Sequence, residues 1–132
     1  MKWIVVACIP FLVLIGCKTT EEALKESGQK PLTADQIEQA MAGNTLMGTG
    51  SSNFTSYLRK DGTLRIVVNG REDKGTWHVK KPNEMCTKYT WIRRGHENCR
   101  RYYMTDGGYQ SVQLDGSASS TFKVVTGNPK KL

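Results

Sequence analysis

Side chains that commonly carry chemistry are scarce in this sequence. Only two histidines are present, His78 and His96. No serine stands in the strand-to-helix turn of a nucleophile elbow, and no glycine-rich loop of the phosphate-cradling kind is found. Four aspartates, among them Asp73, lie beside or near glycine in turn-like segments, where Asp favours hydrogen bonds to the nearby backbone. We therefore expect no catalytic residues and no enzymatic activity.

The sequence also lacks an apolar run long enough to cross a membrane. Its longest run, residues 3–15, has 13 residues, whereas a spanning helix needs about 20. The run follows Lys2 and ends in Leu14-Ile15-Gly16-Cys17, an order that resembles the lipobox of bacterial lipoproteins. The resemblance implies cleavage before Cys17, diacylation of its thiol and often acylation of the new amine. An ordinary secretory signal is the alternative, but it requires a small-x-small cleavage site.

The same resemblance implies where the protein lies in the cell. Two or three acyl chains, at about 0.8 kcal/mol per buried CH₂, hold a protein on a membrane essentially for good. Lys18 follows the cysteine, and in lipoprotein families Asp at that position tends to retain the protein in the inner membrane. We therefore expect lipid anchoring in the outer membrane, facing the periplasm. The expected division of the chain is a signal peptide over 1–16, a polar tether over 17–31, and a helix plus small β domain over 32–132.

Cysteine is rare, with four in the chain. Cys8 lies in the expected signal peptide and Cys17 is the expected lipidation site, so Cys86 and Cys99 remain. In an oxidising compartment this pair predicts a disulfide, and closing a loop of about 14 residues stabilises the fold by roughly 3 kcal/mol. A metal site that includes a histidine is the alternative, but the spacing lacks the close ligand pairs of zinc sites, so we expect no metal and no cofactor. A hairpin turning within residues 95–98 would not pair these two cysteines, which leaves the register open.

Acidic side chains are outnumbered by basic ones, 12 against 19, for a net charge of +7. The excess lies in residues 44–132, which carry 15 basic and seven acidic side chains. A basic domain on a membrane anchor could bind anionic lipid head groups, acidic glycans or an acidic envelope protein. Nucleic acid is scarce outside the cytoplasm and is not an expected partner. The alternative is that the charges only keep the domain soluble.

The β domain is preceded by a well-marked helix signal. Thr33 is a good N-cap, and Gln36 three residues later completes a capping box. Leu32 and Ile37 flank the cap as a hydrophobic staple does. Gly43 suits the left-handed residue that ends a helix. The sequence therefore predicts one short helix just after Thr33.

Strand and turn signals fill the rest of the chain. They cover residues 54–58, 64–68, 75–79, 85–92, 100–104, 109–114 and 121–125. Turn residues such as Asn69-Gly70 separate them at intervals of roughly ten residues, a spacing typical of all-β barrels and sandwiches. We expect a mainly β fold, a small antiparallel barrel or sandwich preceded by one short helix.

Several short motifs occur in a characteristic order: Gly43-Asn44-Thr45, Phe54-x-x-Tyr57, Asp61-Gly62-Thr63 and Gly75-Thr76-Trp77-x-Val79, then two cysteines. The order resembles a group of small bacterial periplasmic and lipoprotein domains, many of unknown function, over about residues 32–112. The resemblance implies a lipocalin-like β domain and brings no catalytic residues with it. Gly75-x-Trp77 is similar to the lipocalin Gly-x-Trp, although it stands in the middle of the chain. We expect Trp77 to be a core aromatic with a hydrogen-bonded indole N–H.

The segment 85–103 is the candidate binding surface, because it has a net charge of +4 and four interleaved aromatic side chains. Arginine and aromatic residues dominate binding hot spots, and guanidinium groups suit phosphate and carboxylate. The predicted binding residues are Trp91, Arg93, Arg94, Arg100, Arg101, Tyr102 and Tyr103. Since adjacent strand residues face opposite sides, we expect at least one tyrosine of Tyr102-Tyr103 to be exposed. The alternative is simple alternation, with the aromatics in the core and the arginines in water.

These observations predict a binding or scaffolding role at the cell envelope. One alternative is inhibition of an external hydrolase such as lysozyme, although lysozymes are commonly basic like this domain and the Ser-Gly-x-x-Tyr loop of such inhibitors is missing. The other is a lipocalin-like carrier of a small apolar ligand.

Overall fold

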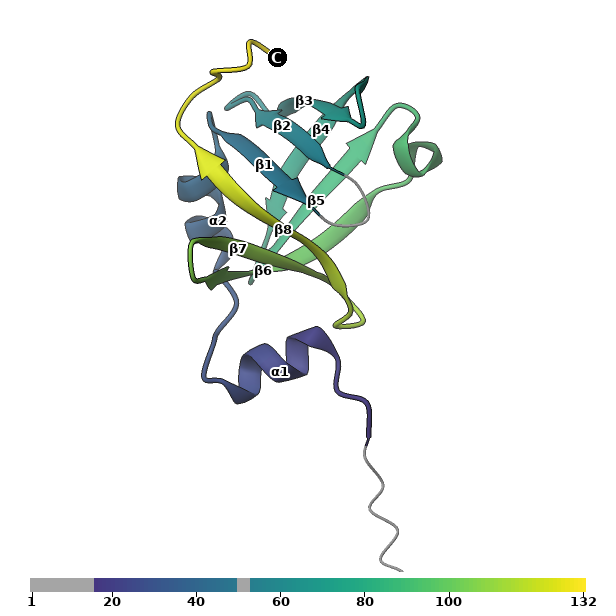
Figure 1. The fold of residues 1–132 in the computed structure, drawn as a ribbon. Coiled ribbons are helices and arrows are strands. Elements are labelled where there is room, and N and C mark those ends of the chain that lie inside the picture. The colour runs from purple at the N-terminus through teal and green to yellow at the C-terminus, as the bar shows by residue number, and fades with distance from the viewer. Residues whose placement is uncertain (1–15, 50–52) are drawn as a thin grey trace, which may run out of the picture.

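The protein folds as a β-barrel accompanied by two short helices (Figure 1). A computed structural model describes residues 16–49 and 53–132. The elements in chain order are α1 (Thr20–Glu26), α2 (Ala34–Met41), β1 (Thr45–Thr49), β2 (Phe54–Leu58), β3 (Thr63–Val68), β4 (Arg71–Lys80), β5 (Glu84–Tyr89), the 3₁₀ turn η1 (Ile92–Gly95), β6 (Asn98–Thr105), β7 (Gly108–Gln113) and β8 (Ala118–Val125). The predicted signal peptide falls on residues that, except for Gly16, lie outside this description.

The eight strands form a closed antiparallel barrel in which each strand pairs with the next along the chain. Closure comes from β1, which pairs with β2 on one side and with β8 on the other. Gly48 lies opposite both Phe54 and Phe122 in these two ladders. The prediction of a mainly β fold with a small antiparallel barrel is confirmed. The sequence signals missed β1, because its five residues include a glycine and show no strong β-branched pattern.

The helix α2 packs against one end of the barrel. Its capping box is present as predicted, with Thr33 as N-cap and Gln36 at the third position. Ile37 and Met41 are fully buried in the main hydrophobic cluster. Gly43 follows the helix with φ +75°, a left-handed conformation that glycine adopts without steric cost. This end of the barrel is therefore filled by helix side chains.

Trp77 lies in the cluster beneath α2. Its side chain is buried, and its indole Nε1 donates to the carbonyl oxygen of Arg59 at 2.8 Å. The expectation of a core aromatic with a hydrogen-bonded N–H is confirmed. A Cβ atom on nearby Gly75 would lie 2.0 Å from the carbonyl oxygen of Lys88, so only glycine permits this close pairing of β4 with β5.

The disulfide between Cys86 and Cys99 is present, as predicted. The two residues face each other directly in the β5–β6 ladder. That register is possible because the ladder is only three pairs long, from Met85 opposite Arg100 to Thr87 opposite Asn98. Residues 88–97 lie outside the β5–β6 ladder and form a connection that includes η1, which we call the excursion. The predicted strand 85–92 therefore ends at Tyr89.

The segment 17–31 differs from the polar tether that the sequence predicts. It contains α1, which lies next to β6 and the β7–β8 turn (Figure 1). The backbone N–H of Glu21 donates to the carbonyl oxygen of Gly116 at 3.0 Å, and the Glu21 side chain is buried. The pattern of hydrophobic residues does not predict this docking of α1, because the buried side chain that makes it is the carboxylate of Glu21. No helix among the described residues is long and apolar enough to cross a membrane.

Candidate functional site at the open end of the barrel

The barrel end opposite α2 is bordered by η1, by the β3–β4 turn and by the β7–β8 turn (Figure 1). A cavity of about 460 Å³ opens there. Its lining residues come from six strands and from η1: Phe54, Ile66, Val68, Tyr89, Ile92, Arg93, Arg100, Gln113, Ala118, Ser119 and Ser120. Most of this lining is apolar or weakly polar, and its only charged side chains are Arg93 and Arg100. The predicted binding segment therefore contributes just two of its arginines to a concave site.

Arg100 and Arg101 lie on opposite sides of β6. Arg100 lines the cavity, whereas Arg101 points outward and binds Glu21 of α1. Alternation along a strand gives adjacent side chains opposite directions. The prediction that Arg101 shares a solvated binding patch with Arg100 is wrong, because Arg101 is held in a largely buried ion pair.

Tyr102 and Tyr103 also face opposite sides, yet both are buried, at 3% and 0% exposure. Tyr102 belongs to the interior cluster and packs edge-on against Phe122. Tyr103 faces outward, where α1 covers it and its hydroxyl donates to Glu21 at 2.7 Å. The expectation that at least one of them is exposed is wrong, because a helix docks on the outer face at this point. Neither tyrosine offers a free binding surface.

Trp91 and Arg94 are exposed on the excursion between β5 and β6. The guanidinium of Arg71 lies 4.3 Å from the centre of the Trp91 ring, a distance at which a cation is attracted to the ring face. The indole Nε1 of Trp91 donates to the carbonyl oxygen of Glu72 at 3.0 Å. These contacts fix Trp91 against β4 at the rim, beside the cavity rather than inside it.

The excursion is held by Asp73, whose role the sequence did not indicate. The buried carboxylate accepts hydrogen bonds from the backbone N–H groups of Thr90, Trp91 and Ile92, at 3.3, 3.0 and 3.0 Å. Burial acts to raise the pKa of Asp73, but these bonds and one from the N–H of Lys74 outweigh it and hold the pKa below its ordinary value. Asp73 thereby positions η1 over the cavity. The sequence predicts a turn-like segment near glycine for Asp73, whereas the structure places it inside β4.

Two successive arginines of η1 adopt the left-handed region, with φ +52° at Arg93 and +53° at Arg94, and Gly95 follows at +72°. A left-handed residue other than glycine costs roughly 1–2 kcal/mol. Such strain persists where the surrounding structure fixes the backbone, and it is concentrated at functional sites. In this loop the strain accompanies the placement of Arg93 at the mouth of the cavity.

The charged side chains at the mouth of the cavity are all positive. None of the ion pairs among the described residues involves Arg93 or Arg100. Burial, together with repulsion from Arg100, holds the pKa of Arg93 below its usual value. The exposed Arg93 and the half-buried Arg100 therefore face one cavity without a carboxylate between them, an arrangement that favours an anion.

Beneath the mouth the barrel interior is nearly filled. Only about 40 Å³ of space remains there, lined by Thr87 and Ser111 among the interior side chains. The hydroxyl oxygen of Thr87 is buried and has no hydrogen-bond partner among the described residues. Space for a small molecule therefore lies at the mouth, and the deep interior offers room for a few atoms at most.

A larger hollow of about 780 Å³ runs past β1, β2 and the β6–β7 turn. It is bounded by Thr49 and Asn53, the residues that flank positions 50–52. We therefore assign no ligand site to this hollow.

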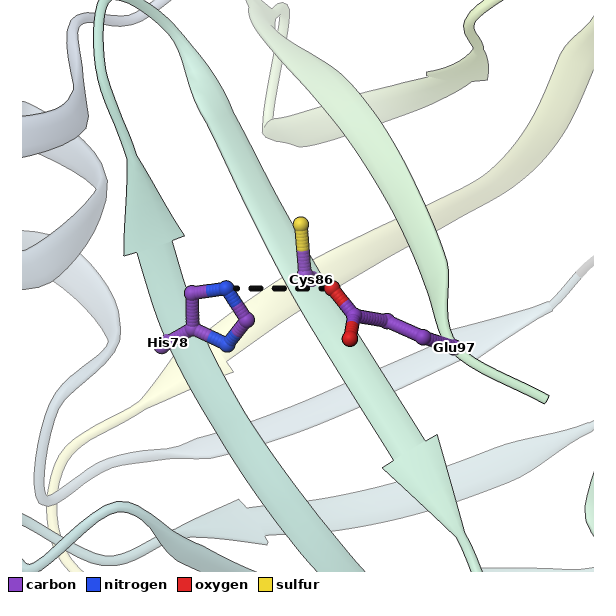
Figure 2. A group of neighbouring side chains, drawn as sticks. All are labelled: His78, Cys86 and Glu97. Atoms are coloured by element: carbon purple, nitrogen blue, oxygen red, sulfur yellow. Dashed lines mark ion pairs between the residues drawn. The ribbon is translucent and has the colours of Figure 1, made fainter. Parts of the chain in front are cut away.

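His78, Cys86 and Glu97 form a second cluster on the outer face of the barrel (Figure 2). His78 lies directly opposite Cys86 in the β4–β5 ladder, and its Nε2 is 3.8 Å from Oε1 of Glu97. The sulfur of Cys86 is bonded to Cys99, so it offers no thiolate to a metal ion. In this oxidised state the cluster provides one exposed His–Glu contact beside a disulfide.

Cys17, the predicted lipidation site, is exposed and has a free thiol group. It lies two residues before Thr19, the N-cap of α1.

Comparison with known proteins identifies no relative, since no family model, no curated protein and no solved structure matches the chain. Lipidation stays a prediction from the lipobox resemblance.

Proposed function

We propose that this chain is a lipid-anchored binding protein of the bacterial outer membrane, whose β-barrel takes a small ligand with an apolar part at its open end. The observation that carries the proposal is the 460 Å³ cavity. Small-molecule sites are concave, mostly apolar and commonly 300–1,000 Å³ in volume, with a few polar groups that orient the ligand. The cavity meets the criteria of shape and volume, and its lining combines an apolar wall with several polar groups.

A carrier role is favoured over a purely scaffolding one because the two barrel ends differ. Ile37 and Met41 of α2 fill one end completely. The other end contains a cavity lined in part by a strained loop, which Asp73 fixes in place. A scaffold needs no cavity, whereas a carrier needs one that is accessible and preformed.

The proposed anchor is compatible with this arrangement. Cys17 is exposed and precedes the first helix, so acyl chains on its sulfur would enter a membrane without displacing any strand. The basic surface of residues 44–132 would favour anionic lipid head groups or acidic envelope components nearby.

Binding of a neutral apolar fluorophore tests the proposed function. A soluble chain that begins at residue 17 with Cys17→Ser keeps every described helix and strand, and export behind a cleavable signal allows the disulfide to form. N-phenyl-1-naphthylamine should bind this chain with a blue-shifted, saturable rise in fluorescence. Ala118→Trp, which places a large ring at the cavity wall, should reduce that binding at least tenfold.

Val125→Trp is the matched control, because it also introduces tryptophan on β8, at an exposed position that does not line the cavity. It should leave binding unchanged. The proposal fails if the probe does not bind the wild-type chain, or if Ala118→Trp and Val125→Trp bind it equally well.

A further inference from the structure

Two guanidinium groups from different elements reach the same cavity. Arg93 comes from the strained loop η1, and Arg100 comes from the interior face of β6. The rest of the lining is apolar or carries neutral polar groups. The charged part of the site is thus confined to the mouth, and the apolar part lies beside and beneath it.

Arg100 is oriented before any ligand arrives. With the amide of Asn98 turned so that its oxygen faces the guanidinium, that oxygen accepts from Nη2 at 2.8 Å and from Nε at 2.9 Å. A guanidinium has five N–H donors, and Asn98 uses two of them. A neutral amide orients Arg100 without cancelling its charge.

Charge neutralisation distinguishes this pair from Arg101. Arg101 has the Glu21 carboxylate as its partner at 2.6 Å, whereas no carboxylate pairs with Arg93 or Arg100 among the described residues. Bringing two like charges together at the mouth of one cavity is unfavourable unless an opposite charge joins them. The left-handed backbone at Arg93 adds a further cost to holding that side chain there.

We propose that Arg93 and Arg100 bind the anionic head group of an amphipathic ligand, such as a carboxylate, sulfonate or phosphate on an apolar body, and that the apolar body occupies the cavity. The inference rests on the proposed function and deepens it by naming the ligand class. The guanidinium fork matches carboxylate and phosphate oxygens, and Phe54, Ile66 and Val68 supply the apolar wall. Neither a free inorganic anion nor a neutral apolar molecule satisfies both halves of the site.

Two fluorophores with the same body test the charge requirement. N-phenyl-1-naphthylamine is neutral, and 8-anilino-1-naphthalenesulfonate carries one sulfonate on the same ring system. The wild-type soluble chain should bind the sulfonate at least tenfold more tightly than the neutral probe. Laurate, a carboxylate with an apolar chain, should displace the sulfonate probe, whereas inorganic phosphate at the same concentration should not.

Variants that remove one positive charge test which arginines cause the preference for the sulfonate probe. Arg93→Gln and Arg100→Gln should each weaken sulfonate binding by at least tenfold and change binding of the neutral probe by less than about twofold. A charge-assisted hydrogen bond is worth about 1.5–3 kcal/mol, which corresponds to roughly a 10- to 150-fold change. Arg94→Gln is the matched control, because Arg94 is adjacent, exposed and absent from the cavity lining. It should bind both probes as the wild type does.

The outcomes separate this inference from the proposed function. If the neutral probe binds but Arg93→Gln, Arg100→Gln and wild type bind the sulfonate alike, the anion site is refuted while the carrier function stands. If neither probe binds the wild-type chain, both are refuted. Should Arg100→Gln lose its folded circular dichroism spectrum, Arg93→Gln decides alone, because that residue lies on an exposed loop outside the barrel ladders.

Discussion

Glu21 and Arg101 lie 80 positions apart in the sequence and form a two-pronged ion pair, in which Nε and Nη2 of Arg101 donate to the two carboxylate oxygens at 2.6 Å each. The hydroxyl of Tyr103 donates to the same carboxylate at 2.7 Å. The hydrogen bond from Arg101 lowers the pKa of Glu21 and outweighs the opposing effect of burial. Burial, as the largest cause, and the contact with Glu21 raise the pKa of Tyr103. The helix nearest the expected lipid anchor is thereby fixed to the barrel wall.

Glu21→Gln should lower the free energy of unfolding by about 3 kcal/mol at pH 7, since it leaves Arg101 without its anion. The pKa of Glu21 is lowered on folding, so its contribution is complete above the unfolded value of about 4.3 and is lost as the pH falls through the folded value. Urea unfolding at several pH values measures this. The difference between wild type and variant should shrink steadily below about pH 4.

Glu26→Gln on the same helix is the control, because Glu26 makes only an exposed pair with Lys18. It should cost less than about 1 kcal/mol at any pH. A Glu21→Gln effect that stays constant down to pH 2 would contradict the ion-pair account.

The disulfide should account for a large share of the stability of this small domain. Cys86→Ser/Cys99→Ser should lower the free energy of unfolding by about 3 kcal/mol, the value that the chain-entropy treatment gives for a loop of this length. Thiol labelling of the denatured, unreduced protein isolated from envelopes should detect neither cysteine. Two labelled thiols would show that the bridge does not form in the cell.

Asp73→Asn should loosen the excursion that carries η1. The substitution removes the charge that receives the N–H groups of Trp91 and Ile92, at a cost of about 2 kcal/mol. Amide hydrogen exchange of these two residues should accelerate at least tenfold, while exchange in β1 and β2 stays unchanged. Because the pKa of Asp73 is lowered on folding, the wild-type protection should also fall as the pH drops through that value. Equal exchange in both proteins would assign the loop conformation to other contacts.

Gly75→Ala should destabilise the barrel strongly, because the new Cβ would meet the backbone oxygen of Lys88 at 2.0 Å. The backbone must shift to relieve that contact, and we expect a loss of about 2–4 kcal/mol. Gly70→Ala is the comparison, since nothing lies within 4 Å of its Cβ and only its φ of +81° is unfavourable for alanine. It should cost about 1 kcal/mol. Thermal melting of both variants measures the contrast, and equal losses would refute it.

Cys17→Ser should prevent lipidation and leave the protein unprocessed or released from membranes. Fractionation of cells, with mass spectrometry of the N-terminus, measures this. A processed Cys17→Ser protein that still sediments with the outer membrane would rule out the lipobox interpretation.

Local chemistry determined much of this fold. The capping box at Thr33 and Gln36, the glycine after α2 and the turn at Asn69-Gly70 each act within a few residues, so the sequence predicts them directly. The disulfide was also predicted from the sequence, because Cys86 and Cys99 are the two cysteines that remain after the expected signal peptide and lipidation site. The number of strand signals and their even spacing indicated a barrel or sandwich, and barrel closure selected between them.

Which arginines share a site was decided only by the tertiary structure. In the sequence Arg93, Arg94, Arg100 and Arg101 form one basic group, but alternation on β6 and the docking of α1 remove Arg101 from it. The excursion held by Asp73 carries Arg93 back to the barrel mouth beside Arg100. These placements depend on contacts between residues distant in the chain, made by buried carboxylates that hydrophobic patterning does not register. The sequence by itself determined where the charge lies along the chain, and the closed barrel determined which charges face a common cavity.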